Sequence, residues 1–185
     1  MSSTSDVWVI SGPSAVGKGT VCARLRELHP EPFYSVSLTT RLPRAGEVDG
    51  ESYHFVDVDE FRRLIEAGEL LEWAVVHGTH YYGTPRRPVV EAVASGRPVI
   101  LEIDLQGARQ VKRNLPSARL VFLTPPTWDE LVSRLRGRGT EDDAAQERRL
   151  ATARLELEAA AEADFVVENA EIEETVAALV GLMGL

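Results

Sequence analysis

The sequence predicts an α/β fold, with a parallel sheet flanked by helices. Short apolar runs recur along the chain, as is typical of strands that are buried on both faces of a parallel sheet. Stretches with the helical spacing of apolar residues lie between them, and this alternation is typical of sheets covered by helices. The length of 185 residues and the hydrophobic content of 44% suffice for one domain with its own core.

The expected core elements follow in chain order. The apolar runs predict strands at residues 7–10, 99–103, 120–123 and 165–167. Apolar spacing predicts helices at residues 18–28, 106–114 and 171–182, the last as a closing layer. Thr127 and Glu130 have the spacing of a capping box that begins a helix at Trp128, and Thr140 with Asp143 predicts another helix start. Trp8 and Trp128 are expected in the core.

Between residues 33 and 82 the pattern changes. Polar and apolar residues alternate at 34–37 and 53–56, a helix-like stretch covers 60–67, and an apolar run covers 70–76. We therefore expect a small, partly antiparallel insert in this part of the chain.

Charge and composition exclude several classes of function. The net charge is −9, and residues 150–185 carry eight acidic side chains against one basic side chain. Nucleic-acid polymers are bound through cations, so we do not expect such a partner. No run of 18 apolar residues and no leader-like start is present, which predicts a cytoplasmic protein without a membrane partner. The single cysteine, Cys22, is expected to serve packing.

A glycine-rich segment after the first strand carries the strongest signal. It comprises Gly12, Pro13, Ser14, Ala15, Val16, Gly17, Lys18, Gly19 and Thr20, and it begins the first helix. Backbone N–H groups of such a loop, together with a helix N-terminus, bind phosphate oxygens. Lys18 is expected to reach the outer phosphates of a nucleoside triphosphate. Gly19 stands where a Ser or Thr is usual, so Thr20 becomes the candidate hydroxyl for Mg²⁺.

The rest of the sequence narrows the phosphate chemistry. Neither lysine lies in an Asn-Lys-x-Asp motif, and the signatures of protein kinases are absent, so a kinase of small molecules fits best. Such an enzyme needs a site for the acceptor. Arg41 and Arg44 flank a rigid Leu-Pro pair, and two guanidinium groups held in this way can bind one phosphate.

The chain resembles guanylate kinases over nearly its whole length. The matching pieces are GPSAVGKGT, SVSLTTRLPRAGEVDGESYHF, LLEW, YYGTP, ILEIDLQG and RLRGRGTE, in the order of the family. The resemblance implies transfer of the γ-phosphoryl group of ATP to GMP with Mg²⁺. It also implies a P-loop NTPase core at residues 6–32, 85–133 and 150–185, a GMP-binding insert at about 33–84 and a helical lid at about 134–149.

The resemblance also assigns roles in GMP binding. The residues that match those holding the GMP phosphate are Arg41, Arg44, Tyr53 and Tyr82. Those that match the guanine-reading set are Ser37, Glu72 and Thr84, with Asp104 beside them. A carboxylate such as Glu72 can accept from guanine N1–H and from its exocyclic amine, whereas adenine would leave the charge unpaired.

Further roles concern ATP, the metal and the lid. Glu102 and Asp104 lie at the end of a predicted strand, where open α/β sheets bind ligands, and Glu102 is a candidate for organising Mg²⁺. The resemblance places Arg134, Arg138 and Arg149 over the transferring phosphoryl group and Asn169 near adenine. His77 and His80 have no nearby cysteine and are not expected to bind a metal.

Two alternatives remain open at this point. A related kinase for a ribose bisphosphate or for another nucleotide would keep the phosphate loop and lack the guanine-reading Glu72. A catalytically silent interaction module of the same fold would lose Lys18 or the lid arginines, which are present. The chain is expected to be a monomer or a small homo-oligomer.

Overall fold

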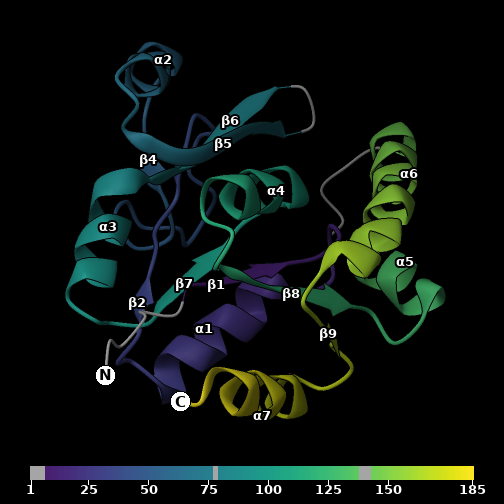
Figure 1. Cartoon of the computed structure of the whole chain (residues 1–185). Coiled ribbons are helices and arrows are strands. Elements are labelled where there is room, and N and C mark those ends of the chain that lie inside the picture. Colours follow the sequence, from purple (N-terminus) through teal and green to yellow (C-terminus); the bar gives the residue numbers. More distant parts are fainter. Residues whose placement is uncertain (1–6, 77–78, 138–142) are drawn as a thin grey trace. The chain divides into compact units, whose positions relative to one another are not determined.

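A computed structural model describes residues 7–76, 79–137 and 143–185 (Figure 1). The first sheet has the strand order β2-β7-β1-β8-β9, and each pairing resolved within it is parallel. Its strands are β1 (Val7–Ser11), β2 (Phe33–Tyr34), β7 (Val99–Glu102), β8 (Arg119–Thr124) and β9 (Phe165–Glu168). The α/β class and the four predicted core strands are therefore confirmed.

The chain divides into two compact units, which are described in turn. The insert unit comprises residues 1–7, 32–101 and 106–118, and the loop unit comprises residues 8–31, 102–105 and 119–185. Within the described residues, no helix has both the length and the apolar character needed to cross a membrane.

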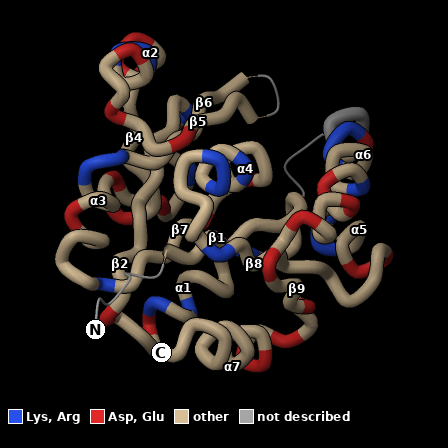
Figure 2. Tube along the Cα trace, viewed as in Figure 1, with Lys and Arg blue, Asp and Glu red and all other residues tan. Residues whose placement is uncertain are grey.

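The loop unit is built on strands β1, β8 and β9. Its helices are α1 (Lys18–Leu28), α5 (Trp128–Arg136), α6 (Asp143–Glu158), the short 3₁₀ helix η1 (Ala159–Glu162) and α7 (Ile172–Met183). Helices α1 and α7 pack together, as Figure 1 shows. Figure 2 shows the acidic residues of α7 and β9 in red, in keeping with the acidic end of the sequence.

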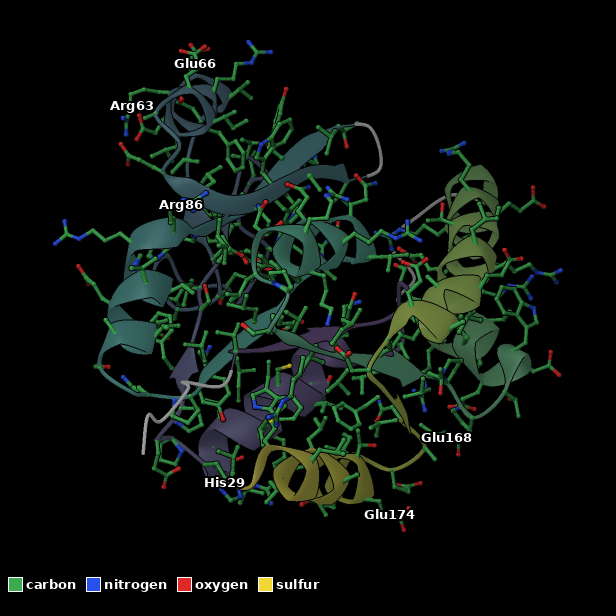
Figure 3. The ribbon with its side chains drawn as sticks, in the orientation of Figure 1. His29, Arg63, Glu66, Arg86, Glu168 and Glu174 are labelled. Atoms are coloured by element: carbon green, nitrogen blue, oxygen red, sulfur yellow. The ribbon has the colours of Figure 1, made fainter. Side chains whose placement is uncertain are left out.

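Strands β1 and β8 form the buried centre of this unit. All five residues of β1 are buried, and Val9 pairs with Leu120 of β8. Strand β9 differs from the prediction, since its side chains alternate between half-buried and exposed. The reason is its place at the edge of the sheet, where Glu168, labelled in Figure 3, is exposed.

Local signals explain where helix α5 begins. The Thr127 side chain accepts a hydrogen bond from the backbone N–H of Glu130 at 3.1 Å, as the capping pattern predicts. The expectation that Trp128 lies in the core is wrong, because its ring is half-buried. The guanidinium carbon of Arg154 on α6 lies 4.6 Å from the centre of that ring, so the ring packs against a charged side chain.

The insert unit contains a second sheet with the order β4-β3-β6-β5. Its elements are β3 (Leu38–Thr39), β4 (His54–Phe55), α2 (Val58–Glu66), β5 (Leu70–Val76) and β6 (His80–Pro85). Strands β3 and β4 are parallel, whereas β6 is antiparallel to both β3 and β5, so the expected partly antiparallel arrangement is confirmed. The alternation at 34–37 gives only β2, which pairs with β7 of the parallel sheet.

A small apolar core holds the second sheet to helix α2. Phe61 is fully buried and packs with Leu38, Leu64 and Leu70. Asp57 caps α2 by accepting from the backbone N–H of Glu60 at 2.8 Å. Helices α3 (Arg86–Ala94) and α4 (Leu105–Asn114) complete the unit.

Helix α3 is tied to this sheet at its first residue. Arg86, labelled in Figure 3, donates from its guanidinium group to the carbonyl oxygens of Gly68 and Leu70, at 3.1 Å each. The turn before β5 is therefore fixed to the start of α3.

Candidate functional site

The loop between β1 and α1 has the backbone geometry of an anion site. Gly12, Ala15 and Gly17 have φ values of 151°, 66° and 101°. A Cβ at Gly12 would lie 2.5 Å from the carbonyl oxygen of Leu123, so only glycine fits there. In the described part of the chain, no side chain caps α1. Its first N–H groups and its positive dipole end therefore remain available to a phosphate.

Lys18 lies folded over this loop. Its Nζ donates to the carbonyl oxygens of Gly12 at 2.6 Å and of Pro13 at 3.3 Å. Loss of hydration lowers the pKa of Lys18, while the negative charges of Glu102, Glu156 and Asp104 act in the opposite direction. The ammonium group of Lys18, held in this way, can exchange its carbonyl partners for phosphate oxygens.

Three carboxylates surround the loop lysine. Burial among protein atoms raises the pKa of Glu102, although part of its side chain stays accessible to water, and Lys18 and Arg26 oppose this shift. Burial also raises the pKa of Glu156, whose Oε2 accepts from the backbone N–H of Ser14 at 3.1 Å. Asp104 belongs to the same unit, where its charge acts on Lys18. These carboxylates would repel the negative charge of a triphosphate, and a divalent cation would reduce that repulsion.

Cys22 lies beside this cluster, on the first helix. It is buried, and loss of hydration raises the pKa of its thiol well above the usual value. The negative charge of Glu102 raises the pKa of the thiol further. The expectation that Cys22 serves packing agrees with this setting, because a neutral, buried thiol is a poor nucleophile.

The predicted ATP-side arginines have different surroundings. Arg134 donates from Nη1 to the carbonyl oxygens of Val16 and Asn169, at 3.1 Å each, and from Nε to Glu130. Arg149 lies half-buried on α6. Arg138 lies outside the described residues.

In the insert unit, Arg41 is held by a network of acceptors. Both Oε atoms of Glu47 accept from its guanidinium group, at 2.8 Å each. Nε of Arg41 donates to the Tyr82 hydroxyl at 3.1 Å, and Nη1 donates to the Leu42 carbonyl at 2.7 Å. The paired charges lower the pKa of Glu47 and raise the pKa of Arg41.

Aromatic rings lie beside Arg41. The guanidinium carbon of Arg41 lies 5.3 Å from the ring centre of Tyr53 and 5.9 Å from that of Phe55. The Tyr53 and Tyr82 rings meet edge to face at 5.8 Å. The structure therefore brings together three of the four residues predicted to hold a phosphate. The fourth, Arg44, is exposed, and its backbone N–H donates to Glu47 at 2.7 Å.

The predicted guanine-reading residues include a buried acid. Glu72 of β5 and Thr84 of β6 are direct partners in the antiparallel register. Their exposed fractions are 4% and 0%, and Oγ1 of Thr84 donates to Oε1 of Glu72 at 2.5 Å. Ser37 lies half-buried just before β3. A carboxylate sunk in a sheet in this way is costly unless a donor meets it.

The backbone next to Glu72 is fixed from outside the sheet. Gln110 of α4 accepts from the Trp73 N–H at 3.3 Å and donates to the Trp73 carbonyl at 2.5 Å. The side-chain amide of Gln110 therefore makes the backbone hydrogen bonds that a neighbouring strand would make at the β5 edge of the sheet. Glu72 is therefore held on a rigid edge strand.

Sequence reasoning missed two acids that contact the site. Glu47 follows Arg44 by three residues, which signals the hydrogen bond from the Arg44 backbone N–H, but its ion pair is with Arg41, six residues away. Glu156 contacts Ser14 across 142 positions of sequence, and no local pattern indicates that contact.

The fold and the loop define a class of protein. A parallel sheet with this glycine-rich loop and lysine is typical of the P-loop kinases that act on small molecules. The family model of guanylate kinase matches residues 4–184. The chain belongs to the guanylate kinase family.

Individual relatives agree with this family. The guanylate kinase of Leifsonia xyli subsp. xyli is 58% identical over 175 residues, which cover 95% of this chain and 69% of that protein. The guanylate kinase of Frankia casuarinae is 57% identical over 175 residues, which cover 95% of this chain and 95% of that protein. The crystal structure of guanylate kinase from Anaplasma phagocytophilum has a TM-score of 0.81 and 33% identity, covering 98% of this chain and 85% of that one.

Proposed function

We propose that this protein transfers the γ-phosphoryl group of ATP to GMP, giving ADP and GDP. One observation carries the choice of acceptor. Tyr82 and Thr84 are two residues apart on β6, so their side chains project from the same face about 7 Å apart. The Tyr82 hydroxyl accepts from Arg41, and the Thr84 hydroxyl donates to the buried Glu72. This spacing supports an acceptor with a phosphate at one end and a base at the other.

The buried carboxylate favours guanine as that base. Ionised Glu72 can only accept hydrogen bonds, and guanine presents two neighbouring donors, N1–H and the exocyclic amine. Adenine has an acceptor at N1, which would face the acceptor oxygens of Glu72 without a hydrogen bond. A mismatch of this kind in a buried polar site rejects the wrong ligand by ~10⁴ or more. Ser37, Thr84 and Asp104 complete the proposed guanine set.

At the other end of the acceptor, Arg41 and Arg44 would bind the phosphate of GMP. Tyr53 and Tyr82 would add hydroxyl donors. Charge-assisted bonds from guanidinium groups to phosphate are short and directional, so they would fix the acceptor oxygen as well as bind it.

ATP is proposed to bind on the loop from Gly12 to Thr20. The free N–H groups at the start of α1 and the lysine would hold the β- and γ-phosphates. Asn169 is proposed to lie near adenine. The boundaries of core, insert and lid stated above remain part of this proposal.

The donor set fits Mg²⁺. No group of three or more His, Cys, Asp or Glu residues in the described ranges is arranged to hold a metal, so the protein alone offers no closed site. Mg²⁺ commonly takes one or two protein oxygens together with phosphates and water. The Thr20 hydroxyl and the Glu102 carboxylate are oxygen donors of that kind, and a Cβ at Gly19 would lie 3.5 Å from Oε1 of Glu102. The bound cation would neutralise charge on the triphosphate.

Catalysis in this proposal is positioning and electrostatics. The acceptor is already an anionic phosphate oxygen, so no general base is needed. Charge on the transferring group is spread over its equatorial oxygens, where Arg134, Arg138 and Arg149 would add positive charge. A well-placed arginine contributes ~10³ to 10⁵ in rate. Exclusion of water protects the phosphoryl group from hydrolysis.

The proposal needs only small nucleotides as ligands. Free ATP and GMP are consistent with a cytoplasmic enzyme that works as a monomer or small homo-oligomer, without a nucleic-acid polymer or a membrane.

A coupled assay of ADP release tests the proposal. The assay compares GMP, AMP, CMP, UMP and a ribose bisphosphate as acceptors, with Mg²⁺ and ATP present. We expect turnover with GMP to exceed that with every other acceptor by at least ~10²-fold. Preference for a ribose bisphosphate would favour the related kinase, and no ADP release with any acceptor would favour the silent module.

A further inference from the structure

One carbonyl oxygen of the phosphate loop receives two side chains from distant parts of the chain. Nδ2 of Asn169 donates to the carbonyl oxygen of Val16 at 2.7 Å, and Nη1 of Arg134 donates to the same oxygen at 3.1 Å. The donors are 153 and 118 positions away in sequence. Both belong to the loop unit.

The loop needs such donors because of its own geometry. A loop that turns its N–H groups toward an anion turns carbonyl groups away from it, and a buried carbonyl without a donor is costly. Val16 is fully buried. The Val16 carbonyl therefore depends on protein donors for its hydrogen bonds. Its orientation also sets that of the Gly17 N–H, because the two groups share one peptide plane.

The amide of Asn169 packs directly on that peptide. A Cβ at Gly17 would lie 2.7 Å from Nδ2 of Asn169, which is too close for any side chain. Asn169 itself is only 4% exposed. The contact therefore leaves the amide with little surface for a ligand.

Further hydrogen bonds hold the backbone and the side chain of Asn169 in place. Its backbone N–H donates to the Thr124 carbonyl at 2.7 Å, and its own carbonyl accepts from Arg134 at 3.1 Å. Oγ1 of Thr175 lies 2.9 Å from Oδ1 of Asn169. The Val16 carbonyl can only accept, so the amide must present its nitrogen to the loop and its oxygen to Thr175.

We infer that Asn169 is a positioning residue for the phosphate loop, which acts through the Val16 carbonyl on every triphosphate donor whatever its base. The inference rests on the proposed binding of ATP at this loop. Arg134 of α5 donates to the same Val16 carbonyl oxygen, so this oxygen also links helix α5 to the loop.

The substitution Asn169→Asp tests this role with little change of shape. It replaces the donor that faces Val16 with an acceptor and leaves an acceptor for Thr175. We expect the KM for ATP to rise by about tenfold, as for loss of one hydrogen bond to a buried carbonyl. The same factor is expected in the KM for inosine triphosphate and in the inhibition constant of inorganic tripolyphosphate. The KM for GMP should stay within twofold.

The outcomes separate positioning from contact with the base. A residue that reads adenine would lose ATP binding, while tripolyphosphate, which has no base, would inhibit the variant as well as the wild type. That result would overturn the inference. If the wild-type protein itself bound neither ATP nor tripolyphosphate, the proposed function would fail instead.

A second variant keeps the inference testable if Asn169→Asp does not fold. Thr175→Val removes the hydroxyl that faces Oδ1 of Asn169 and should raise all three donor constants by a common factor of two to five. Thr152→Val is the matched control, because exposed Thr152 donates only to a carbonyl four residues back on α6. Unchanged donor constants in a folded Thr175→Val protein would contradict the inference.

Discussion

Glu47 holds the guanidinium group of Arg41 with both carboxylate oxygens, at 2.8 Å each. Together with Tyr82 and Leu42, it engages four of the five N–H donors of Arg41. The exposed fractions of the two charged side chains are only 11% for Arg41 and 20% for Glu47. The proposed phosphate site thus contains a carboxylate of the protein itself, and a phosphate of GMP would have to share Arg41 with it or replace it.

This ion pair predicts a stability change that depends on pH. Arg41 lowers the folded-state pKa of Glu47 below its unfolded value, so the stabilisation is present above the unfolded value and is lost as pH falls through the folded one. Glu47→Gln should therefore lower the free energy of unfolding by about 1 kcal/mol or less at pH 7.

Urea unfolding of both proteins between pH 3 and pH 7 measures this difference. The gap between wild type and variant should narrow as pH falls below the unfolded-state pKa of a glutamate, about 4.3, and close as pH passes the lower folded-state pKa of Glu47. Glu51→Gln, an exposed acid of the same loop, is the control and should change little. A gap that stays constant with pH would contradict the role of the Glu47 charge.

Glu72→Gln is expected to weaken selection of the base. The glutamine side chain keeps one acceptor and adds a donor, so guanine loses one of its two bonds and adenine gains a partner. We expect the ratio of kcat/KM for GMP over AMP to fall by at least ~10-fold. Glu69→Gln, just before the same strand and exposed, is the control. An unchanged ratio would refute the assignment of Glu72.

Lys18→Ala is expected to abolish turnover while the fold persists. Lys18 is half-buried and its Nζ donates to the carbonyl oxygens of Gly12 and Pro13 alone in the described contacts, so its removal should alter the loop locally and leave the fold intact. Loss of a charge that faces the transferring phosphates should reduce kcat by ~10³-fold or more. Lys112→Ala changes the only other lysine and should leave kcat intact. Turnover near the wild-type level in Lys18→Ala would contradict the proposed mechanism.

Gly17→Ala separates a steric contact from backbone strain. Gly17 and Gly46 both have positive φ, at 101° and 85°, so alanine costs about 1 kcal/mol of strain at either position. Only at Gly17 would the new Cβ meet Asn169, at 2.7 Å, whereas nothing lies within 4 Å at Gly46.

We therefore expect Gly17→Ala to lower the melting temperature more than Gly46→Ala does. It should also raise the KM for ATP. Thermal unfolding and donor kinetics of the two variants provide the comparison. Equal effects of the two substitutions would show that the Asn169 contact is unimportant.

Much of the fold followed from local patterns. Runs of apolar residues fixed the strands of the parallel sheet, and the capping pattern at Thr127 located the start of α5. The phosphate loop was equally visible, because its glycines and lysine are contiguous. Each of these signals lies within a few residues of the structure that it predicts.

Contacts between distant side chains could not be predicted in this way. The approach of Asn169 to Val16 and of Glu156 to Ser14 depends on how helices and strands pack, which no sequence spacing encodes. The partial exposure of β9 follows from its edge position, which depends on strand order and not on its own apolar run. The contact of Arg154 of α6 with the Trp128 ring likewise joins residues that are distant in sequence, so the local apolar pattern did not reveal it.

Calorimetric titration with GMP and with guanosine tests most directly whether one acceptor lies between Arg41 and Glu72. The titrations compare the wild type with Arg41→Ala and Glu72→Gln. We predict that Arg41→Ala weakens binding of GMP by ~10²-fold or more but leaves guanosine binding unchanged, because guanosine has no phosphate. Glu72→Gln should weaken both ligands. No binding of GMP to the wild-type protein, or equal loss of guanosine and GMP in Arg41→Ala, would contradict the account.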